Sequence, residues 1–506
     1  MVASRRGLYW SSPVRREGTR TLSPIPNEIY LEIFSYVRLP YFAGPALRRD
    51  MSSLAQVCRF FCSVMLPWIY EHVIIDAKVK DDGISNTRAA FCQRLARGEA
   101  SAQEMALFVR KCTIKSWVVA DKEADWCSRA LLRMYSKALC SMTNIRVLEL
   151  ISTTVTKDLI TGIAHLPNLE SLTVKDCRFS PGIAAKHVDK IHSLKLKKLC
   201  VYLLDNREHS WDPTIDDLIL SSINLAHLIR LETNSTELCA RLGQTATLHL
   251  EHLDFRSSNI DDAPLLQSIL PHTKTLKRLC YSSCSRAEAL HLLPEHLPVL
   301  ASVKAPLEYV KALVPGRPVS SVECIGWEDP AITLADILVL RNSKAPIEHI
   351  HVLSSCYMDI PLFDYFPQLK SLELTFLLKD SEEYSGCDVK QDLEQDMLTI
   401  FRKWPKNPDL QDIVLAFDIM EWAPLNRFDL QIQHHWVSDI ISPLFPSLSR
   451  CQFDKSIDWF YSLEDLDWRP HVVVEQAQNL LKGLKSGMFE DYDNFFTNLL
   501  NQDQWI

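Results

Sequence analysis

The chain has 506 residues, and its composition of 47% hydrophobic and 23% charged residues is that of a globular protein able to bury a large core. No apolar run reaches the ~18–20 residues of a membrane helix, and the N-terminus lacks the apolar stretch of a signal peptide, so we expect neither a membrane nor secretion. The formal net charge of −8 argues against nucleic acid as the main partner.

Residues 1–21 form a basic segment ahead of any amphipathic pattern. Five arginines stand there against Glu17 alone. Short basic clusters of this kind are common, so we expect a disordered tail, with a nuclear address as the alternative.

Residues 22–76 carry the spacing of short amphipathic helices. A first helix is predicted from apolar residues at helical intervals, with a proline tolerated in its first turn. A second helix is predicted to begin near Asp50, after an interruption by Pro40, Gly44 and Pro45, and to end at Pro67. The residues that carry the two patterns are Ile25, Pro26, Ile29, Ile33, Phe34 and Val37, then Leu54, Val57, Cys58 and Phe61.

These residues resemble the F-box, in which an apolar residue, a proline, any residue and a glutamate precede alternating aliphatic residues. Ile25 to Ile29 reproduce that start, and the second helix supplies the Val-Cys-Arg-x-Phe and Pro-Trp elements of the family. The link over residues 38–50 is longer and richer in proline than usual, which leaves the path between the helices open. Residues 91–114 resemble the linker of fungal, basidiomycete-type F-box proteins, where a helix leads into a first strand.

The resemblance implies docking on the SKP adaptor of a cullin–RING ubiquitin ligase through apolar anchors at helical spacing. The alternative is that these helices only cap a repeat array, because such arrays need their exposed core face covered. Carried over position by position, the adaptor-binding residues are Pro26, Ile29, Ile33, Leu54, Val57, Cys58 and Phe61.

After a helical linker over residues 77–108, one short apolar pattern recurs across residues 109–454. Each instance reads apolar, two free positions, apolar, one free position, apolar, and most instances follow one another at 19 to 28 residues. Such a spacing is typical of leucine-rich repeats, which hold one strand and one helix in each unit. The thirteen instances begin at Val109, Ile145, Leu169, Leu196, Leu228, Leu250, Leu276, Leu300, Val319, Ile347, Leu369, Leu410 and Leu448.

The fold class predicted for this region is therefore α/β, an irregular leucine-rich-repeat-like solenoid, or horseshoe, of parallel strands with outer helices. A non-repetitive α/β domain is the alternative, since the repeat is degenerate and rarely has the expected Asn or Cys after the strand. The acidic stretch Lys379–Asp396 is predicted to be a solvated loop, and residues 455–506 a helical, acidic C-terminal cap.

The free position between the last two apolar residues of each strand should point away from the core, because side chains alternate along a strand. These positions predict a concave, substrate-binding surface of mixed charge with an acidic tilt, which suits a basic partner or is simply a solvated face. The predicted residues are Glu149, Thr173, Glu232, Asp254, Lys304, Glu323, His351 and Glu373.

Motifs for catalysis are missing, so we expect the chain not to be an enzyme and to need no cofactor. It has no phosphate loop, dinucleotide-binding turn, nucleophile elbow or HExxH helix. Close histidines occur at His249 and His252, His349 and His351, and His434 and His435, but none has cysteines at zinc-like spacing, so we expect no metal.

Fifteen cysteines lie along the chain without CxxC pairs, and several stand inside apolar strand-like runs. Reduced buried thiols pack as small hydrophobic groups, so we expect a reducing cytoplasmic or nuclear setting. The cysteines in such runs are Cys112, Cys200, Cys280, Cys324 and Cys451.

Taken together, the resemblance and the repeat predict the substrate-recognition subunit of an SKP–cullin–F-box ubiquitin ligase. Such a subunit catalyses nothing and raises the local concentration of a protein substrate beside the charged enzyme. The alternative is an interaction scaffold that recruits partners without ubiquitination. The sequence does not identify the substrate.

Overall fold

The structure is a computed structural model in which the chain forms two compact units, Met1–Leu250 and Glu251–Ile506. The predicted basic tail, the acidic stretch Lys379–Asp396 and residues 473–506 lie outside the described residues. The structure describes residues 26–37, 45–77, 84–117, 126–180, 183, 194–202, 227–244, 248–257, 263–283, 290–325, 333–353, 362–377, 407, 409–418, 430–453, 457–463 and 466–472.

Unit 1 opens with three helices, α1 (Asn27–Val37), α2 (Pro45–Ala55) and α3 (Arg59–Glu71). They share a small core in which Phe34, Met51 and Met65 are buried, one from each helix. Phe61 lies edge-on to Phe34, with ring centroids 4.8 Å apart, and the two rings tie α1 to α3. The predicted helical module therefore has a hydrophobic centre of its own.

The second predicted helix is wrong in its boundaries. Two helices stand there, because Cys58 is extended, at φ −159° and ψ 169°, and its Sγ accepts the Phe61 N–H at 3.4 Å as the N-cap of α3. Pro45, expected to interrupt a helix, begins α2, where a missing N–H costs nothing. Pro67 lies inside α3, which continues to Glu71. Packing of α3 side chains such as Trp68 against the shared core outweighs the local cost of the proline.

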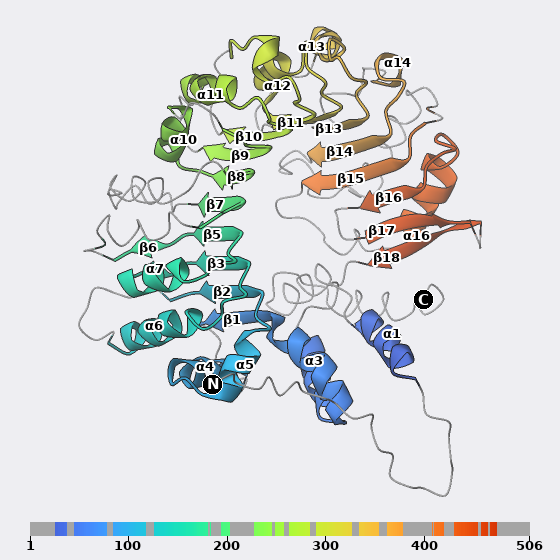
Figure 1. The fold of residues 1–506 in the computed structure, drawn as a ribbon. Coiled ribbons are helices and arrows are strands. Elements are labelled where there is room, and N and C mark those ends of the chain that lie inside the picture. Colours follow the sequence, from blue (N-terminus) through green and yellow to red (C-terminus); the bar gives the residue numbers. More distant parts are fainter. Residues whose placement is uncertain are drawn as a thin grey trace, which may run out of the picture. The chain divides into compact units, whose positions relative to one another are not determined.

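The remaining elements of unit 1 build a parallel sheet with helices between its strands (Figure 1). Its strand order is β1-β2-β3-β5-β7-β8, and β4 pairs with β6 in a small second sheet. These elements are β1 (His72–Asp76), α4 (Ile84–Ala96), α5 (Ala100–Ala106), β2 (Lys111–Lys115), α6 (Trp126–Leu139), β3 (Val147–Ile151), β4 (Thr154–Val155), α7 (Lys157–Ala164), β5 (Ser171–Lys175), β6 (Arg178–Phe179), β7 (Lys198–Tyr202), β8 (Arg230–Thr233) and α10 (Thr236–Gly243).

The sheet begins earlier than the sequence suggests. β1 comes directly after α3, inside the segment predicted as the helical module, and pairs in parallel with β2 from His72↔Lys111 onward. β1 was not predicted because residues 22–76 were assigned to the helical module, and α4 and α5 stand over the predicted linker that follows it.

Unit 2 continues the same alternation, with neighbouring strands from β9 to β16 parallel. Its elements are β9 (His252–Ser257), α11 (Ala263–Ile269), η5 (Leu270–His272), β10 (Arg278–Ser283), η6 (Pro294–His296), β11 (Ser302–Ala305), α12 (Leu307–Leu313), β12 (Ser321–Cys324), α13 (Leu334–Leu340), β13 (His349–Leu353), α14 (Leu362–Tyr365), β14 (Ser371–Leu377), β15 (Asp412–Asp418), α16 (Leu430–His435), η9 (Trp436–Ile441), β16 (Arg450–Phe453), β17 (Ile457–Ser462) and β18 (Asp467–Val472).

The predicted helical cap after residue 454 is wrong over its first part. β17 and β18 form an antiparallel extension of the sheet there, and Trp459 and Trp468 are almost fully buried. The Trp459 indole N–H donates to Gln433 Oε1 at 2.9 Å, which fixes β17 against α16. Of the helices in the described ranges, none is long and apolar enough to cross a membrane.

All thirteen predicted strands are confirmed, β2, β3, β5 and β7 to β16, each beginning two residues after the first residue of its apolar triplet. In β3, for example, Leu148 and Leu150 are buried while their neighbours are partly exposed. β8 departs from the pattern, with Thr233 as its third core residue. That threonine is fully buried, and its Oγ1 accepts the Ser235 N–H at 3.0 Å.

A repeated backbone hydrogen bond sets the register between strands. The Arg110 carbonyl oxygen, just before β2, accepts two N–H groups at the start of the next strand, β3. They come from Arg146 at 2.8 Å and Val147 at 3.1 Å. In unit 2 the Lys370 carbonyl does the same with Gln411 and Asp412, at 2.8 and 3.0 Å. Each unit is thus an α/β array of parallel strands, compatible with a leucine-rich-repeat-like solenoid.

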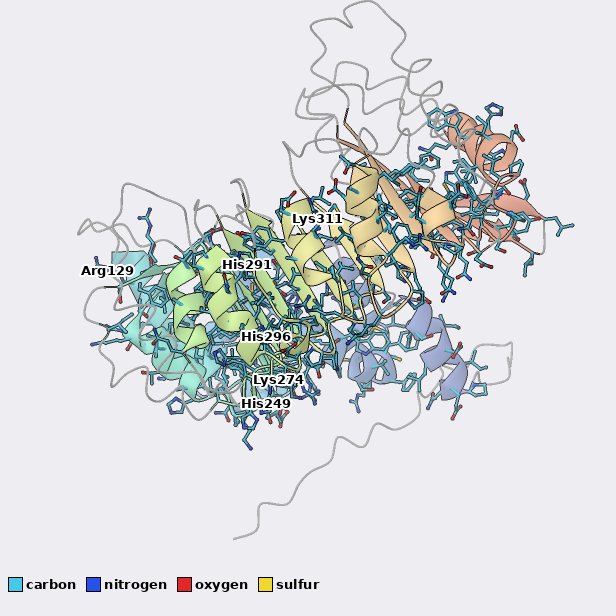
Figure 2. The ribbon with its side chains drawn as sticks, turned by 90° about the horizontal axis from the view of Figure 1, so that it is seen from above. Arg129, His249, Lys274, His291, His296 and Lys311 are labelled. Atoms are coloured by element: carbon cyan, nitrogen blue, oxygen red, sulfur yellow. The ribbon has the colours of Figure 1, made fainter. Side chains whose placement is uncertain are left out.

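Within unit 2, side chains also join successive repeats on the helix side. Lys311 on α12, labelled in Figure 2, places its Nζ 3.0 Å from Glu308 and 2.8 Å from Asp336 of α13. Hydrogen bonds to Asp336 and then Glu308 raise the pKa of Lys311. The buried Arg317 guanidinium donates to five backbone carbonyls, including Leu313 at 3.0 Å and Leu293 at 2.8 Å, so it closes the end of α12 against the preceding loop.

Gly162 lets α7 approach α6. A Cβ at this position would stand 2.7 Å from the Ser136 carbonyl oxygen, which is too close for a carbon. We expect Gly162→Ala to lower the free energy of unfolding by about 1–3 kcal/mol through overpacking, although alanine favours helix. Thr161→Ala on the same helix is the matched control and should change stability little. Urea unfolding measures both variants, and equal stability of the two would contradict the close approach.

Candidate interaction surfaces

The first candidate surface lies on the N-terminal helices, where large apolar side chains face outward. Ile29 and Ile33, one turn apart on α1, are each 50% exposed, and Val57 between α2 and α3 is 65% exposed. Tyr30 and Phe34, the next residues along the helix, point to the shared core instead. α1 is therefore apolar on an inner stripe and on an adjoining outer stripe, which is typical of an interface.

The structure divides the predicted adaptor-binding residues into two groups. Pro26, Ile29, Ile33 and Val57 are exposed. Leu54 and Phe61 pack against the module's own core, and Cys58 caps α3, so these three are half-buried. Helical periodicity could not separate inner from outer residues in the second pattern. The chain leaves helical geometry at Cys58, so Leu54 and Phe61 belong to two different helices and Val57 lies between them. Leu31, 46% exposed, is an outward apolar residue that the motif missed.

The second candidate surface consists of the strand residues that alternate with the core residues. In unit 1 the middle residues of neighbouring strands stand side by side in the order Thr113, Glu149, Thr173, Cys200, Glu232. In unit 2 the order is Asp254, Cys280, Lys304, Glu323, His351, Glu373. We call these the polar rows of the two units. All eight residues predicted from the repeat lie in them, and substrate binding by these residues stays a prediction.

Ion pairs run along the polar row of unit 1. Lys111 Nζ lies 2.6 Å from Glu149 Oε1, and the Thr113 hydroxyl donates to Glu149 Oε2 at 2.8 Å. Glu232 pairs with both Lys198 and Arg230 at 2.8 Å. Burial raises the pKa of each carboxyl, but hydrogen bonds from the lysines lower it more, and both pKa values fall below the usual range.

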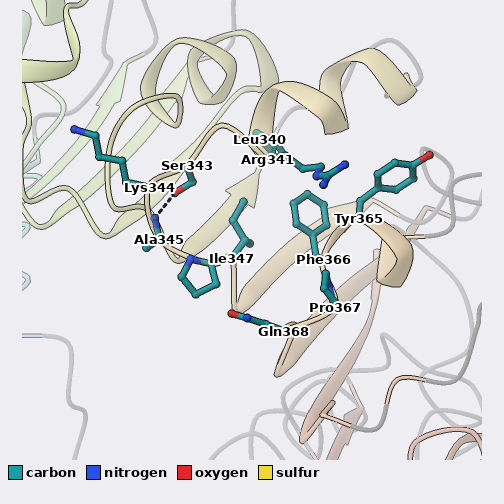
Figure 3. Close-up of a pocket in the computed structure, with 11 residues that line it drawn as sticks. Leu340, Arg341, Ser343, Lys344, Ala345, Ile347, Tyr365, Phe366, Pro367 and Gln368 are labelled. Atoms are coloured by element: carbon teal, nitrogen blue, oxygen red, sulfur yellow. Dashed lines mark hydrogen bonds between the residues drawn. The ribbon is translucent and has the colours of Figure 1, made fainter.

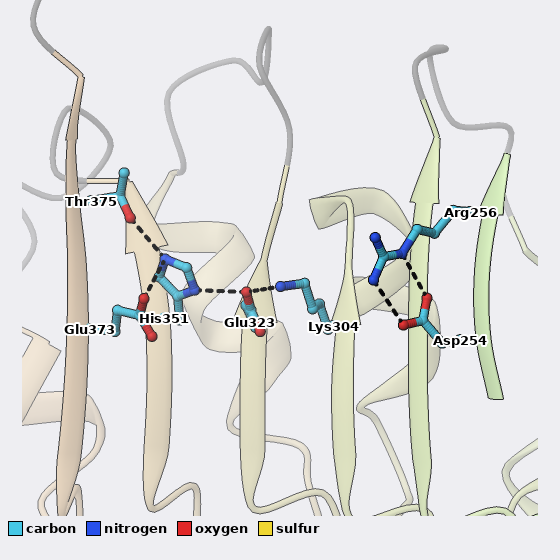
Figure 4. Close-up of polar contacts among 7 residues, drawn as sticks. All are labelled: Asp254, Arg256, Lys304, Glu323, His351, Glu373 and Thr375. Carbon is cyan, nitrogen blue, oxygen red and sulfur yellow. Dashed lines mark hydrogen bonds and ion pairs between the residues drawn. The ribbon is translucent and has the colours of Figure 1, made fainter. Parts of the chain in front are cut away.

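In unit 2, Glu323 is held from both sides of its strand (Figure 4). Lys304 Nζ on β11 forms an ion pair with Glu323, and His351 Nδ1 on β13 lies 2.9 Å from Glu323 Oε1. His351 Nε2 lies 2.9 Å from Thr375 Oγ1 and 3.7 Å from Glu373 Oε1. One interaction chain therefore links four consecutive strands across the sheet.

The electrostatic consequence is clearest at Glu323. Burial raises the pKa of its carboxyl, but hydrogen bonds from His351 and Lys304, with the charge of Lys304, lower it more, to about 2. Glu323 is therefore an anion over the whole physiological range, partly neutralised by Lys304.

Sequence reasoning missed Thr113, Cys200 and Cys280, which complete the rows. Position alone would have found them, since they occupy the same place in the repeat as the charged residues. Both thiols are buried, and burial first, then the nearby carboxylates Glu232 and Asp254, raises the pKa of Cys200 and of Cys280 to about 12. Low-pKa thiols are the reactive ones, so these two act as packing groups.

The five cysteines predicted in strand-like runs are all buried on strands, as expected of reduced thiols. The histidine pairs do not gather ligands, and within the described ranges no group of three or more His, Cys, Asp or Glu could hold a metal ion. His434 instead lies 3.1 Å from Asp467, and His435 lies 2.6 Å from Asp439.

A cavity of about 270 Å³ lies between the segments that lead into β13 and β14 (Figure 3). Its walls include Arg341, Lys344, Pro346, Tyr365 and Phe366. Ser343 is engaged within the fold, since its Oγ donates to the Val319 carbonyl at 2.7 Å and accepts the Ala345 N–H at 3.3 Å. The polar side chains of its lining include Arg341, Lys344 and Tyr365, and no carboxylate or histidine lines it.

No protein-family model matches the chain, and no curated protein matches it. Among solved structures, the chain is similar to one from the complex of Rad7 and Elc1 in yeast, with a TM-score of 0.34, 12% identity, and coverage of 80% of this chain and 97% of that one. A TLR13–ssRNA13 complex gives a TM-score of 0.32, 13% identity, and coverage of 64% and 57%. At these TM-scores neither likeness assigns a fold or a partner.

The ion pairs of Glu323 predict a pH-dependent stability. Because the carboxyl pKa falls from its ordinary value of 4.5 to about 2 on folding, its contribution is complete above pH 4.5 and is lost as the pH falls toward 2. The difference in free energy of unfolding between the wild type and Glu323→Gln should therefore shrink over that interval.

Urea unfolding at a series of pH values measures this difference. Glu104→Gln, which removes an exposed carboxylate from α5, measures the effect of the substitution itself. A Glu323→Gln difference that is the same at pH 7 and near pH 2 would contradict the assigned ion pairs.

Proposed function

We propose that this chain is the substrate-recognition subunit of an SKP–cullin–F-box ubiquitin ligase. The N-terminal helices would bind the SKP adaptor, and the polar rows of the parallel strands would bind the protein to be modified. In this proposal the chain catalyses no step, needs no cofactor and acts in the cytoplasm or the nucleus. Its contribution is to hold the substrate at a high effective concentration near the ubiquitin-charged enzyme.

One observation carries the adaptor half of the proposal. α1 to α3 already share a core around Phe34, Met51 and Met65, yet Ile29, Ile33 and Val57 remain about half exposed or more. Burying such a side chain from full exposure is favourable by about 1.5–3 kcal/mol, and roughly half of that remains to be gained at each of these three residues, which together supply a driving force for binding a partner. They stand at the positions that the F-box resemblance assigns to the adaptor.

The half-buried residues then have a different role from the exposed ones. Leu54, Cys58 and Phe61 shape the module from within, so their loss would act through folding. Ile29, Ile33 and Val57 would contact the adaptor directly. Leu31 would extend the same surface on α1.

We expect Ile29→Asp and Val57→Asp each to abolish binding to the purified SKP adaptor, because a charge would be buried in place of an apolar anchor. Pull-down of the adaptor by the full chain measures the effect. Circular dichroism shows that each variant is folded.

Leu334→Asp is the matched control. Leu334 is 45% exposed, close to the value for Ile29, and begins α13, where an aspartate suits the helix N-terminus. The control should bind the adaptor as the wild type does. Adaptor binding by folded Ile29→Asp and Val57→Asp would refute the interface, and an adaptor complex that recruits no purified cullin would favour a scaffold without ubiquitination.

A further inference from the structure

The cavity between the segments that lead into β13 and β14 is an apolar slot with polar groups at its rim (Figure 3). Ile347 from the first segment and Phe366 from the second line it, and both are 5% exposed. Arg341 and Gln368 stand at opposite ends of the lining in Figure 3, while the Lys344 side chain extends away from the rest. The slot therefore combines apolar walls with one guanidinium group near an end.

The charge of the lining is positive and is not balanced within the described ranges. Arg341 lies over the Tyr365 ring, with its guanidinium carbon 6.0 Å from the ring centroid, and forms no ion pair with a described residue. Glu348, just beyond the lining, is engaged by Lys370 Nζ at 2.7 Å. Asp364 is exposed on α14 and does not line the cavity. Arg341 is thus a cation beside the slot without an anionic partner from these ranges.

The walls and the cation together define the chemistry of a ligand. A phosphate is strongly hydrated, and the apolar walls offer no donors to replace its water. A neutral apolar group would fill the slot but would take water from Arg341 without giving it a partner. A carboxylate attached to an apolar group meets both requirements, because a guanidinium binds a carboxylate through two parallel hydrogen bonds.

The size of the slot limits the apolar group. Its volume of about 270 Å³ lies just below the range of about 300–1,000 Å³ that is typical of small-molecule pockets. A group the size of one large side chain is therefore the most that the slot takes.

We propose that this slot binds the C-terminal residue of a polypeptide, with the carboxylate on Arg341 and an apolar side chain between Ile347 and Phe366. The rim favours a chain end over a free acid: Arg341 and Gln368 are exposed, so the slot is open and the preceding residues can leave it. The Gln368 amide forms no hydrogen bond with a described residue and can bond the backbone of the bound chain.

This inference goes beyond the proposed function and does not depend on it. The slot lies before the strands, outside the polar rows and the N-terminal helices. It is a separate site for a chain end.

The test uses the full chain and the fluorescein-labelled peptide GSGSGF with a free C-terminal carboxylate. One counterpart ends in a carboxamide, which keeps the phenylalanine and removes the charge. The other, GSGSGS, keeps the carboxylate and removes the ring. Fluorescence anisotropy at physiological salt should show that both counterparts bind about tenfold more weakly or less, because one lacks the charge-assisted hydrogen bonds and the other the buried apolar group.

Arg341→Gln should weaken binding of the carboxylate peptide about tenfold or more and leave binding of the carboxamide unchanged. Arg341→Lys should fall between the wild type and Arg341→Gln, since lysine keeps the charge but not the two parallel hydrogen bonds. Arg129→Gln is the matched control: it removes the same charge from an exposed position on α6, labelled in Figure 2, and should leave the affinity within about twofold of the wild type.

Equal affinity of the wild type for the carboxylate and carboxamide peptides, or equal weakening by Arg341→Gln and Arg129→Gln, would overturn the inference. Competition by 3-phenylpropanoate tests the source of the carboxylate, because it has the ring and the charge but no chain. It should displace the labelled peptide only at a concentration at least about tenfold above that of unlabelled GSGSGF, since it lacks the backbone contacts. Displacement at the same concentration would overturn the assignment to a chain end.

The adaptor pull-down is repeated with Arg341→Gln, which should bind the SKP adaptor as the wild type does. Loss of adaptor binding in this variant would contradict the separation of the two sites. Failure of the wild type to bind the carboxylate peptide, with adaptor binding intact, would overturn the inference about the slot and leave the proposed function standing.

Discussion

The rest of each unit depends on one hydrogen-bonding arrangement, the backbone carbonyl just before a strand that accepts two N–H groups of the next strand. It occurs at Arg110, Arg146 and Glu170 in unit 1 and at Glu251, Lys277 and Lys370 in unit 2. Since a slip of one residue would exchange the core face for the polar face, this arrangement fixes which side chains are buried and which stand in a row. The polar rows follow from the register and need no further interaction to align.

That alignment gives ordinary surface residues a collective property. Lys304, Glu323 and His351 lie more than 18 residues apart in sequence from one another, yet they form one chain of contacts on adjacent strands. Each exposed ion pair would contribute little by itself. In register they hold Glu323 ionised and set a pattern of charge across neighbouring strands. The polar rows are thus a product of the backbone geometry.

The core of the sheet could be predicted from the sequence because its signal is local and repeated. In β3, for example, the buried Leu148 and Leu150 alternate with partly exposed residues over five positions, and a strand formed at every place where the apolar pattern recurs. The break at Cys58 and the continuation of α3 through Pro67 could not be predicted, since capping and tertiary packing decide them. The β17–β18 hairpin was missed because the last instance of the apolar pattern begins at Leu448 and the pattern does not continue into these antiparallel strands. Which module residues face outward also required the structure, since Ile29 and Phe34 are both apolar at helical spacing.

The two halves of the proposal place two partners on different parts of the chain, and hydrogen–deuterium exchange tests that division most directly. The full chain is compared with and without the purified SKP adaptor. Slower exchange is predicted in α1 and around the turn at Val57, with no change in β11 to β14. Slower exchange confined to the strands of unit 2, with none in α1, would contradict the assignment of the adaptor to the N-terminal helices.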